Sequence, residues 1–366
     1  MKVTFPHMGP VLAYRKLFTK LGHEVIMPPR PSDRTIALGV KHSPEFICFP
    51  FKIILGSYLE AIERGAELIV TSGGIGACRA GYFGALSEKI LRGLGHDVRV
   101  IVFDNIFEDF PAFYRQLQLL TNQTPLRQSL AALQLALHLV WAYDKYEKKL
   151  AALRPYEKIP GTCNQSWREI QGLLDGSDNL RQLWLHMKQA DALVAAVERV
   201  ERPEVLKVGL VGEIYLVMEG SMNHELEGRL AALGVAAVRY RYISSWLQHC
   251  FFPPRPIFRR ADRYLKYSVG GHERENIGQI IAYKEQGFDG IIHVMPFGCM
   301  PELVTQTIIP TLSEDLDLPI LSLSLDEQTG WVNNQVRLEA FIELLHNRRE
   351  LAKEGQGQYG QRIFGN

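Results

Sequence analysis

The sequence predicts an α/β protein with two Rossmann-like parallel-sheet domains and a helical connecting region. Apolar strand-like runs alternate with helical patterns over the first hundred residues, and the same rhythm returns after residue 204. Continuous apolar strands that alternate with helices are typical of a parallel sheet covered on both faces. The length of 366 residues also exceeds one typical domain. We therefore expect an α/β domain at 1–105, a helical connection or cap at 106–204, and a second α/β domain at 205–366.

The first domain should alternate strand and helix from its first residues. Its expected strands are Lys2–Pro6, Glu24–Pro29, Glu67–Gly74 and Val98–Asp104. Helical spacing of apolar residues predicts helices at Gly9–Gly22, Ile53–Arg64 and Ser87–Gly95. An apolar run, Phe46–Phe51, leads into the second of these helices.

The middle region is predicted to be helical, and the second domain to repeat the first loosely. Long helical patterns cover Leu126–Leu153 and Leu180–Glu201. Strands are then expected at Val205–Tyr215, Ala236–Ile243, Gly290–Phe297 and Pro319–Asp326. Helices are expected at His224–Gly234, within Gly270–Gly287, and from about Val336 onward.

Composition and charge exclude several classes of protein. The formal net charge is +1 and no long basic run is present, which argues against a nucleic-acid binder that neutralises phosphates. The N-terminus has no signal-peptide pattern, and no apolar run approaches the length of a membrane span. We therefore expect a cytoplasmic protein with no nucleic acid or membrane as partner. Five cysteines do not make a disulfide framework, and in a reducing compartment cysteines in special positions indicate metal binding or catalysis.

Three cysteines share one kind of context. Cys48, Cys78 and Cys299 are each predicted to lie at or just beyond the carboxyl end of a parallel strand. Ligands of open α/β sheets bind outside these strand ends, so two facing domains would bring the three thiols to one cleft. No CxxC pair is present, which excludes an ordinary zinc ribbon or ferredoxin pattern. Three soft thiolates from separate loops suit an iron–sulfur cluster with one iron left open, or zinc.

Glycines and a cation near these cysteines fit the same interpretation. The backbone amides around Gly73, Gly74 and Gly76 could donate to cluster sulfides. In "MPFGCMPE", Gly298 is expected to keep the approach to the cluster free of a side chain, while Pro296 and Pro301 restrict the turn and Phe297 and Met300 exclude water. Arg79 and Lys52 could offset cluster charge, or could be solvated cations of a helix face.

Two further residues are candidate catalytic groups. Glu213, at the end of a predicted strand, could donate a proton to a reduced substrate, or could be satisfied by the next helix N-terminus. His272 could donate to the cluster or to substrate, or could simply cap a helix. His293 is expected to be a packed core histidine, and Glu302 to begin a helix.

The two remaining cysteines have plainer settings. Cys163 and Cys250 are expected to be small buried hydrophobes, although Cys163 follows Pro-Gly and is the first candidate for a fourth cluster ligand.

Four stretches resemble one known family. They are "KHSPEFICFPFKIILGSYLEAIERGAELIVTSGGIGACRAGYFG", "VGEIYLVMEGSMNHELEGRLAALGV", "GHERENIGQIIAYKEQGFDGIIHVMPFGCMPE" and "SLDEQTGWVNNQVRLEAF". They resemble proteins related to the activases of 2-hydroxyacyl-CoA dehydratases, which are relatives of the dehydratase and benzoyl-CoA reductase cluster subunits and of double-cubane cluster proteins. The stretches cover most of the chain outside the helical middle.

The resemblance implies a cofactor and a partner. The cofactor is a [4Fe–4S] cluster on Cys48, Cys78 and Cys299, or in some relatives a double-cubane [8Fe–9S] cluster, which needs more cysteine ligands than three. Two chains could share the larger cluster across a homodimer interface. The implied partner is an ATP-hydrolysing activase, itself an iron–sulfur homodimer that supplies low-potential electrons.

The chain itself is expected to receive electrons, since it has no GxxxxGK[ST] loop. An acyl-CoA substrate follows from the relatives alone. The alternatives are an activase-binding scaffold with a structural cluster and a zinc–thiolate protein.

Overall fold

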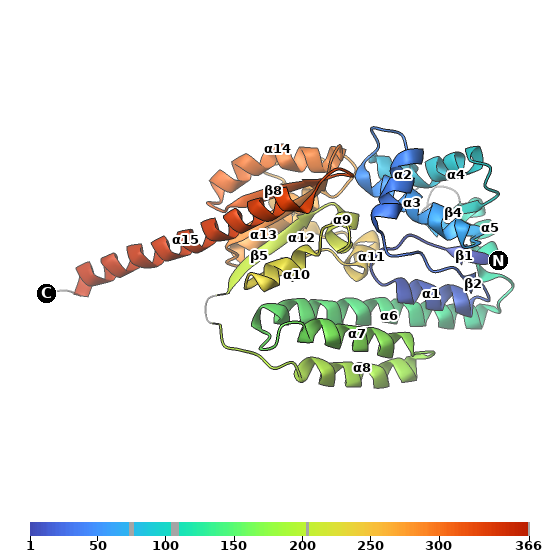
Figure 1. The fold of residues 1–366 in the computed structure, drawn as a ribbon, viewed down its shortest axis with the longest axis horizontal. Helices are drawn as coiled ribbons and strands as arrows, with labels where there is room; N and C mark the ends of the chain where they lie inside the picture. The colour runs from blue at the N-terminus through green and yellow to red at the C-terminus, as the bar shows by residue number, and fades with distance from the viewer. Residues whose placement is uncertain (73–76, 104–109, 203–204, 365–366) are drawn as a thin grey trace.

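The protein is an α/β fold with two four-stranded sheets, all of whose strands are parallel, as the sequence predicts. A computed structural model describes residues 1–72, 77–103, 110–202 and 205–364 (Figure 1). The strands of the first sheet, β1 to β4, span Lys2–Thr4, Glu24–Val25, Leu68–Thr71 and Arg99–Val102. The strands of the second sheet, β5 to β8, span Leu206–Gly212, Val235–Arg239, Gly290–Pro296 and Ile320–Leu325.

The two sheets have the same strand order, so the second domain repeats the topology of the first. The orders are β2-β1-β3-β4 and β6-β5-β7-β8. In the first sheet Val3 of β1 pairs with Val25 on one side and Leu68 on the other. In each sheet the first strand in the chain lies between the second and the third, so the strand order reverses between the first and third strands. Ligands of such sheets bind at the carboxyl ends of these two strands.

The first domain contains one helix that the sequence analysis does not predict. Its helices α1 to α4 span Val11–Lys20, Asp33–His42, Phe49–Glu63 and Phe83–Gly93, with a 3₁₀ turn, η1, at Arg79–Tyr82. The unpredicted helix is α2, which begins at a capping box formed by Ser32 and Thr35. Residues 26–67 are all described and contain no strand, so Phe46–Phe51 is not a strand and Cys48 does not follow one. Cys48 instead ends the connection between α2 and α3.

Helices α2 and α3 pack with their backbones nearly in contact. A Cβ atom added at Gly39 would lie 1.8 Å from the carbonyl oxygen of Lys52. One added at Gly56 would lie 1.9 Å from the carbonyl oxygen of Thr35. Only glycine permits this approach, because the neighbouring atoms belong to backbone that cannot turn aside. The two glycines therefore place the start of α3, and with it Cys48.

Gly39→Ala should destabilise the protein by about 3 kcal/mol or more, because the added methyl group must separate two packed helices. Gly172→Ala is the matched control, since Gly172 also lies within a helix but an added Cβ there meets no atom within 4 Å. The control should be neutral or stabilising by about 0.5–1 kcal/mol. Urea unfolding measures both, and equal stabilities of the two variants would contradict the close packing.

The helical middle region lies along one side of both domains (Figure 1). Its helices α5 to α8 span Phe110–Thr121, Leu126–Leu153, Thr162–Asp175 and Leu180–Ala195, with a 3₁₀ turn, η2, at Arg154–Tyr156. Toward the first domain, Lys16 of α1 pairs with Asp178 at 2.7 Å. Toward the second, the amide of Ser244 donates to Asp144 of α6 at 2.7 Å, and the buried Arg239 pairs with Glu147. The long helix α6 thus fixes the two domains relative to each other.

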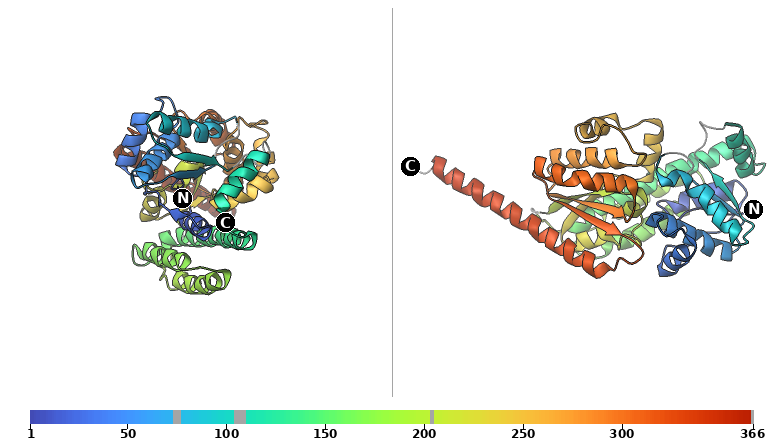
Figure 2. Two further views of the ribbon diagram at one scale, coloured as in Figure 1. Left: turned by 90° about the vertical axis from the view of Figure 1, so that its right-hand side faces the viewer. Right: turned by 90° about the horizontal axis from the view of Figure 1, so that it is seen from above.

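The second domain carries the remaining helices. They are α9 Ile214–Met218, α10 Leu226–Ala232, α11 Ile243–Phe251, α12 Arg255–Ala261, α13 Glu273–Glu285, α14 Met300–Asp315 and α15 Trp331–Phe364. The last helix, α15, extends well beyond the body of the molecule (Figure 2). No helix in the described ranges is both long enough and apolar enough to pass through a lipid bilayer.

The main apolar core joins the two domains. Phe49 and Ile53, at the start of α3, are buried among residues of β5, β7 and β8 and of α15. A residue of the first domain, His7, also bonds Glu219 of the second at 2.8 Å. The carboxyl edges of the two sheets are consequently held against each other.

Candidate functional site

All three predicted ligand cysteines lie at the N-terminal ends of helical segments. Cys48 immediately precedes α3, Cys78 precedes η1, and Cys299 precedes α14. Each has an extended backbone conformation, and α3 and α14 both have proline in their first turn. The N-terminal end of a helix carries partial positive charge and free N–H groups, which favour a thiolate over a thiol. The sequence places these cysteines near strand ends, and their positions immediately before helical turns are visible only in the structure.

The topology places two of these cysteines at equivalent points. Cys78 follows β3 and Cys299 follows β7, the third strand of each sheet. Cys48 precedes α3, the helix that leads into β3, and in the second domain the residue before the corresponding helix α13 is His272. At these two equivalent positions the first domain thus has Cys48 and Cys78, and the second domain has His272 and Cys299.

The pKa values of the three thiols are all raised, chiefly by burial. Burial, followed by the charges of Glu213 and Cys78, raises the pKa of Cys48 to about 12. Burial also raises the pKa of Cys299, with contributions from Glu213 and Cys48. The pKa of Cys78 is raised by burial first, and again Glu213 contributes. Glu213 therefore lies within electrostatic reach of all three thiols.

A glycine pair keeps the segments of Cys78 and Cys299 together. A Cβ atom added at Gly270 would lie 2.7 Å from the amide nitrogen of Cys78. One added at Gly271 would lie 2.4 Å from the ring of Pro301, two residues after Cys299. The loop before α13 thus fits between the two segments only because it has no side chains there.

Arg79 joins the other two cysteine segments. Its guanidinium donates to the carbonyl oxygen of Phe46 at 2.6 Å, which connects the turn after Cys78 with the turn before Cys48. The charge of Arg79 also lowers the pKa of Cys48. Arg79 is exposed, yet its position is consistent with a cation that offsets negative charge at the thiols.

Glu213 satisfies the alternative expectation that it caps a helix. Its carboxylate accepts hydrogen bonds from the amides of Tyr215 and Leu216, at 3.1 and 2.9 Å. Burial nevertheless raises its pKa to about 7, and the neighbouring Glu302 raises it as well. A carboxyl group with a pKa near neutrality can hold or release a proton under ordinary conditions, so the capping role does not remove a role in proton transfer.

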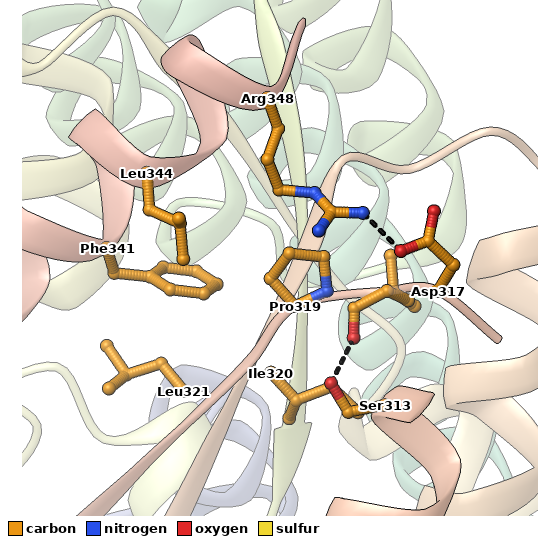
Figure 3. A pocket seen from close by; sticks show the side chains of 9 residues that line it. Ser313, Asp317, Pro319, Ile320, Leu321, Phe341, Leu344 and Arg348 are labelled. Carbon is orange, nitrogen blue, oxygen red and sulfur yellow. Dashed lines mark hydrogen bonds and ion pairs between the residues drawn. The ribbon is translucent and has the colours of Figure 1, made fainter. Parts of the chain in front are cut away.

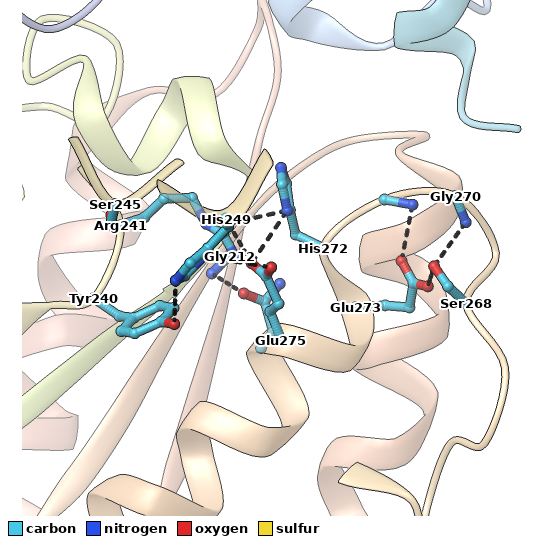
Figure 4. Close-up of polar contacts among 12 residues, drawn as sticks. Gly212, Tyr240, Arg241, Ser245, His249, Ser268, Gly270, His272, Glu273 and Glu275 are labelled. Atoms are coloured by element: carbon cyan, nitrogen blue, oxygen red, sulfur yellow. Dashed lines mark hydrogen bonds and ion pairs between the residues drawn. The ribbon is translucent and has the colours of Figure 1, made fainter. Parts of the chain in front are cut away.

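His272 belongs to a buried charged cluster that also contains Arg241 and Glu275 (Figure 4). Arg241 donates to Nδ1 of His272 at 2.9 Å and to Glu275 at 2.5 Å. Because Nδ1 accepts this bond, the ring proton of the neutral imidazole is on Nε2. Burial and the charge of Arg241 lower the pKa of His272. His272 is thus a neutral side chain with one N–H donor.

Arg241 and Glu275 are site residues that the sequence analysis missed. Arg241 is 5% exposed, and its Nη2 has no hydrogen-bond partner within the described ranges. A buried cationic donor without a partner fits a site that receives an anionic group. For Glu275 the available signal was the density of charge in "GHEREN", which spans the start of α13; this stretch does not include Arg241.

His293 and Glu302 form a second buried polar group beneath the cysteines. Nε2 of His293 contacts the carboxylate of Glu302 at 2.7 Å. The side-chain nitrogen Nδ2 of Asn276 donates to both oxygens of the same carboxylate. His293 is completely buried, as expected, and Glu302 lies in the first turn of α14, as expected. Their mutual contact fixes the start of α14 against β7.

Several other predicted site residues have different roles. Gly73, Gly74 and Gly76 lie outside the described residues. Gly298 has a φ angle of +71° and open space around it, so the turn itself requires glycine. Phe297 is 67% exposed and therefore does not seal the site from water as predicted.

Lys52 is not a solvated cation on a helix face, which was one of its two expected roles. Lys52 is buried and pairs with Glu327, after β8, at 2.5 Å. The ammonium group thus has a carboxylate partner of its own and joins the first domain to the second.

The remaining cysteines lie away from this site. Cys163 is fully buried in the apolar core of the helical middle, among residues such as Leu135 and Ile170. This position confirms the expectation that Cys163 is a buried hydrophobe. It does not agree with a role of Cys163 as the fourth cluster ligand. Cys250 is exposed near the end of α11, so the expectation that it is buried is wrong. All five cysteines are described, and none forms a disulfide.

Two cavities of the described chain have no cysteine in their lining. One of about 340 Å³ is lined by residues including Ser313, Pro319 and Arg348, at the amino end of β8 (Figure 3). Another, of about 630 Å³, lies beside Asp326, Asn334 and Arg337, where α15 begins. Within the described ranges, no group of three or more His, Cys, Asp or Glu side chains is close enough to hold a single metal ion.

Comparison with known proteins yields no relative. No protein-family model matches the chain, and no curated protein sequence matches it significantly.

The ionisation of Glu275 should make the native protein sensitive to acid. Burial alone would raise its pKa, but the buried guanidinium of Arg241, which donates to this carboxylate, lowers the pKa to about 2, below the value in the unfolded chain. The resulting stabilisation is complete above the unfolded pKa and is lost as the pH falls toward about 2, with an upper bound of about 3 kcal/mol.

We expect Glu275→Gln to flatten the dependence of unfolding free energy on pH between about 5 and 2.5. Glu285→Gln is the control, because Glu285 is on the same helix but pairs with Arg260 in solvent. Urea unfolding at several pH values measures the effect. An unchanged pH slope for Glu275→Gln would mean that this carboxylate is not selectively stabilised in the native state.

Proposed function

We propose that the chain is an iron–sulfur protein that holds a [4Fe–4S] cluster on Cys48, Cys78 and Cys299. In this proposal it accepts low-potential electrons from an ATP-hydrolysing activase in the cytoplasm. It then acts as an electron carrier or as a reductase- or dehydratase-like component, and acyl-CoA thioesters are the first substrate class to test. The cluster would supply one-electron chemistry at low potential.

One observation carries the proposal. Three cysteines from three separate segments each stand at the start of a helical turn. Close contacts join these segments, because the Gly270–Gly271 loop packs on Cys78 and Pro301, and Arg79 bonds the carbonyl oxygen of Phe46. Buried thiols of raised pKa are poor nucleophiles toward solvent, but a metal centre deprotonates coordinating thiols outright. The arrangement is therefore better suited to holding a polynuclear metal group than to a free-thiol nucleophile.

The surrounding residues fit a negatively charged group. The partnerless Nη2 of the buried Arg241, the guanidinium of Arg79 and the helix N-termini all favour negative charge at this place. The zinc alternative stays open, because the same three soft thiolates would also suit zinc.

The chain's own residues would control protons and access at the site. Glu213, with a pKa of about 7, can hold a proton beside the thiolates, and His272 presents its Nε2–H as a neutral donor. Gly270 and Gly271 close the domains against each other and so limit water around the thiols. These roles require no residue outside the described site.

Cys48→Ala, Cys78→Ala and Cys299→Ala should each lose most of the bound iron and sulfide, because each removes one of three ligands. Anaerobic purification followed by iron, sulfide and zinc analysis measures the loss. Cys163→Ala and Cys250→Ala are controls that should retain the wild-type iron content, since both lie away from the site.

Two results of this experiment would overturn the proposal. Stoichiometric zinc without iron in the wild-type protein would establish the zinc alternative. Full iron content in any one of the three variants would remove that cysteine from the ligand set. If iron is bound but a strong chemical reductant never reduces it, the cluster is structural and the protein is a scaffold.

Gly298→Val should reduce iron loading strongly, because a β-branched residue is strained at a φ of +71° and would displace Cys299. Gly298→Asn is the matched variant, since asparagine tolerates this backbone region better and the surrounding space is open. Iron content per folded chain should follow the order wild type, Asn, Val. Equal loading of the Val variant would mean that the turn does not position the ligand.

A further inference from the structure

An apolar stripe occupies the solvent-facing side of α6. Its five large side chains are between 39% and 74% exposed, and they are Leu126, Leu130, Leu133, Leu137 and Trp141. At 100° per residue these positions fall within one narrow arc, while the buried residues Leu135, Leu139 and Ala142 face the protein on the opposite side. Contiguous apolar surface of this kind is rare on monomeric proteins and marks an interaction site.

The stripe is free of charge as well as apolar. No Asp, Glu, Lys or Arg occurs between residues 128 and 143. A helix face that remains in water normally carries charged side chains. The partner of this face must therefore also be apolar and helix-like in shape, which does not suit a phosphate-rich or strongly charged molecule.

The patch continues onto α8. The ring of His138 lies 6.3 Å from that of Trp184, and both Trp184 and Leu185 are more than half exposed. The stripe itself extends for about 22 Å at 1.5 Å per residue.

The spacing of the stripe is self-complementary. The five positions are nearly symmetric about a point between residues 133 and 134. If two copies of α6 cross antiparallel on a two-fold axis at that point, Leu126 meets Trp141, and Leu130 meets Leu137. The two Leu133 side chains then meet at the axis. The four steps between these positions, of four, three, four and four residues, also follow the three- and four-residue rows by which paired helices interlock.

We propose that α6 is the interface of a homodimer, in which two copies pair antiparallel through Leu126, Leu130, Leu133, Leu137 and Trp141. A two-fold axis makes this contact isologous, so each copy uses the same surface and the assembly closes at two. The stripe lies on the helical middle and not on the cysteine site, so the proposal does not depend on the proposed function.

Charge substitutions in the full-length protein test both the surface and its orientation. Leu130→Glu or Leu137→Glu should weaken dimerisation at least about 100-fold, because each dimer would bury two unpaired carboxylates. The double variant Leu130→Glu/Leu137→Lys should recover much of the affinity, since antiparallel pairing places each glutamate opposite a lysine of the second copy. Leu351→Glu, at a 67% exposed leucine on α15, is the control and should have no effect.

Sedimentation equilibrium over a range of protein concentrations measures the dissociation constants, and circular dichroism verifies that each variant is folded. A wild-type protein that is monomeric at all concentrations would overturn the proposal. A dimer insensitive to both single substitutions would also overturn it. A double variant no tighter than the single variants would exclude the antiparallel arrangement. Binding of a monomer to phosphatidylcholine vesicles, lost in Leu130→Glu, would assign the stripe to a lipid surface instead.

Discussion

The contact between the Gly270–Gly271 loop and the two cysteine segments determines the rest of the site. Neither glycine has room for a Cβ atom, because one faces the backbone of Cys78 and the other faces Pro301. If the two domains were farther apart, Cys78 would lie farther from Cys299 and Glu213 would be exposed to water. The buried start of α3 supports the same closure, since Phe49 and Ile53 are part of the second domain's core.

Duplication of the fold explains why the site is nearly, but not fully, symmetric. The same strand order in both halves brings the third strands and their following turns to facing edges. Cys78 and Cys299 therefore meet, while Cys48 and His272 occupy the corresponding helix starts. Cys48 on one side and the cluster of His272, Arg241 and Glu275 on the other give the two halves of the site different side chains at equivalent helix starts.

The charges around the site oppose one another in a limited volume. Glu213 and Glu302 disfavour thiolates, whereas Arg79, Arg241 and the helix N-termini favour them. The helical middle contributes nothing to this balance directly. It instead holds both domains through Lys16, Glu147 and Asp144, and leaves the apolar face of α6 turned away from the site.

The sequence by itself determined the α/β class and the positions of the strands, because strand periodicity and glycine–proline turns are local signals. It did not reveal α2, whose glycine Gly39 weakens the helical pattern and is explained only by its contact with α3. Arg241 and Glu275 were likewise missed, whereas Cys163 is the buried hydrophobe that was expected. The roles of Arg241 and Glu275 depend on contacts between side chains that are distant in the chain. Only the tertiary structure decides which of these side chains are in contact.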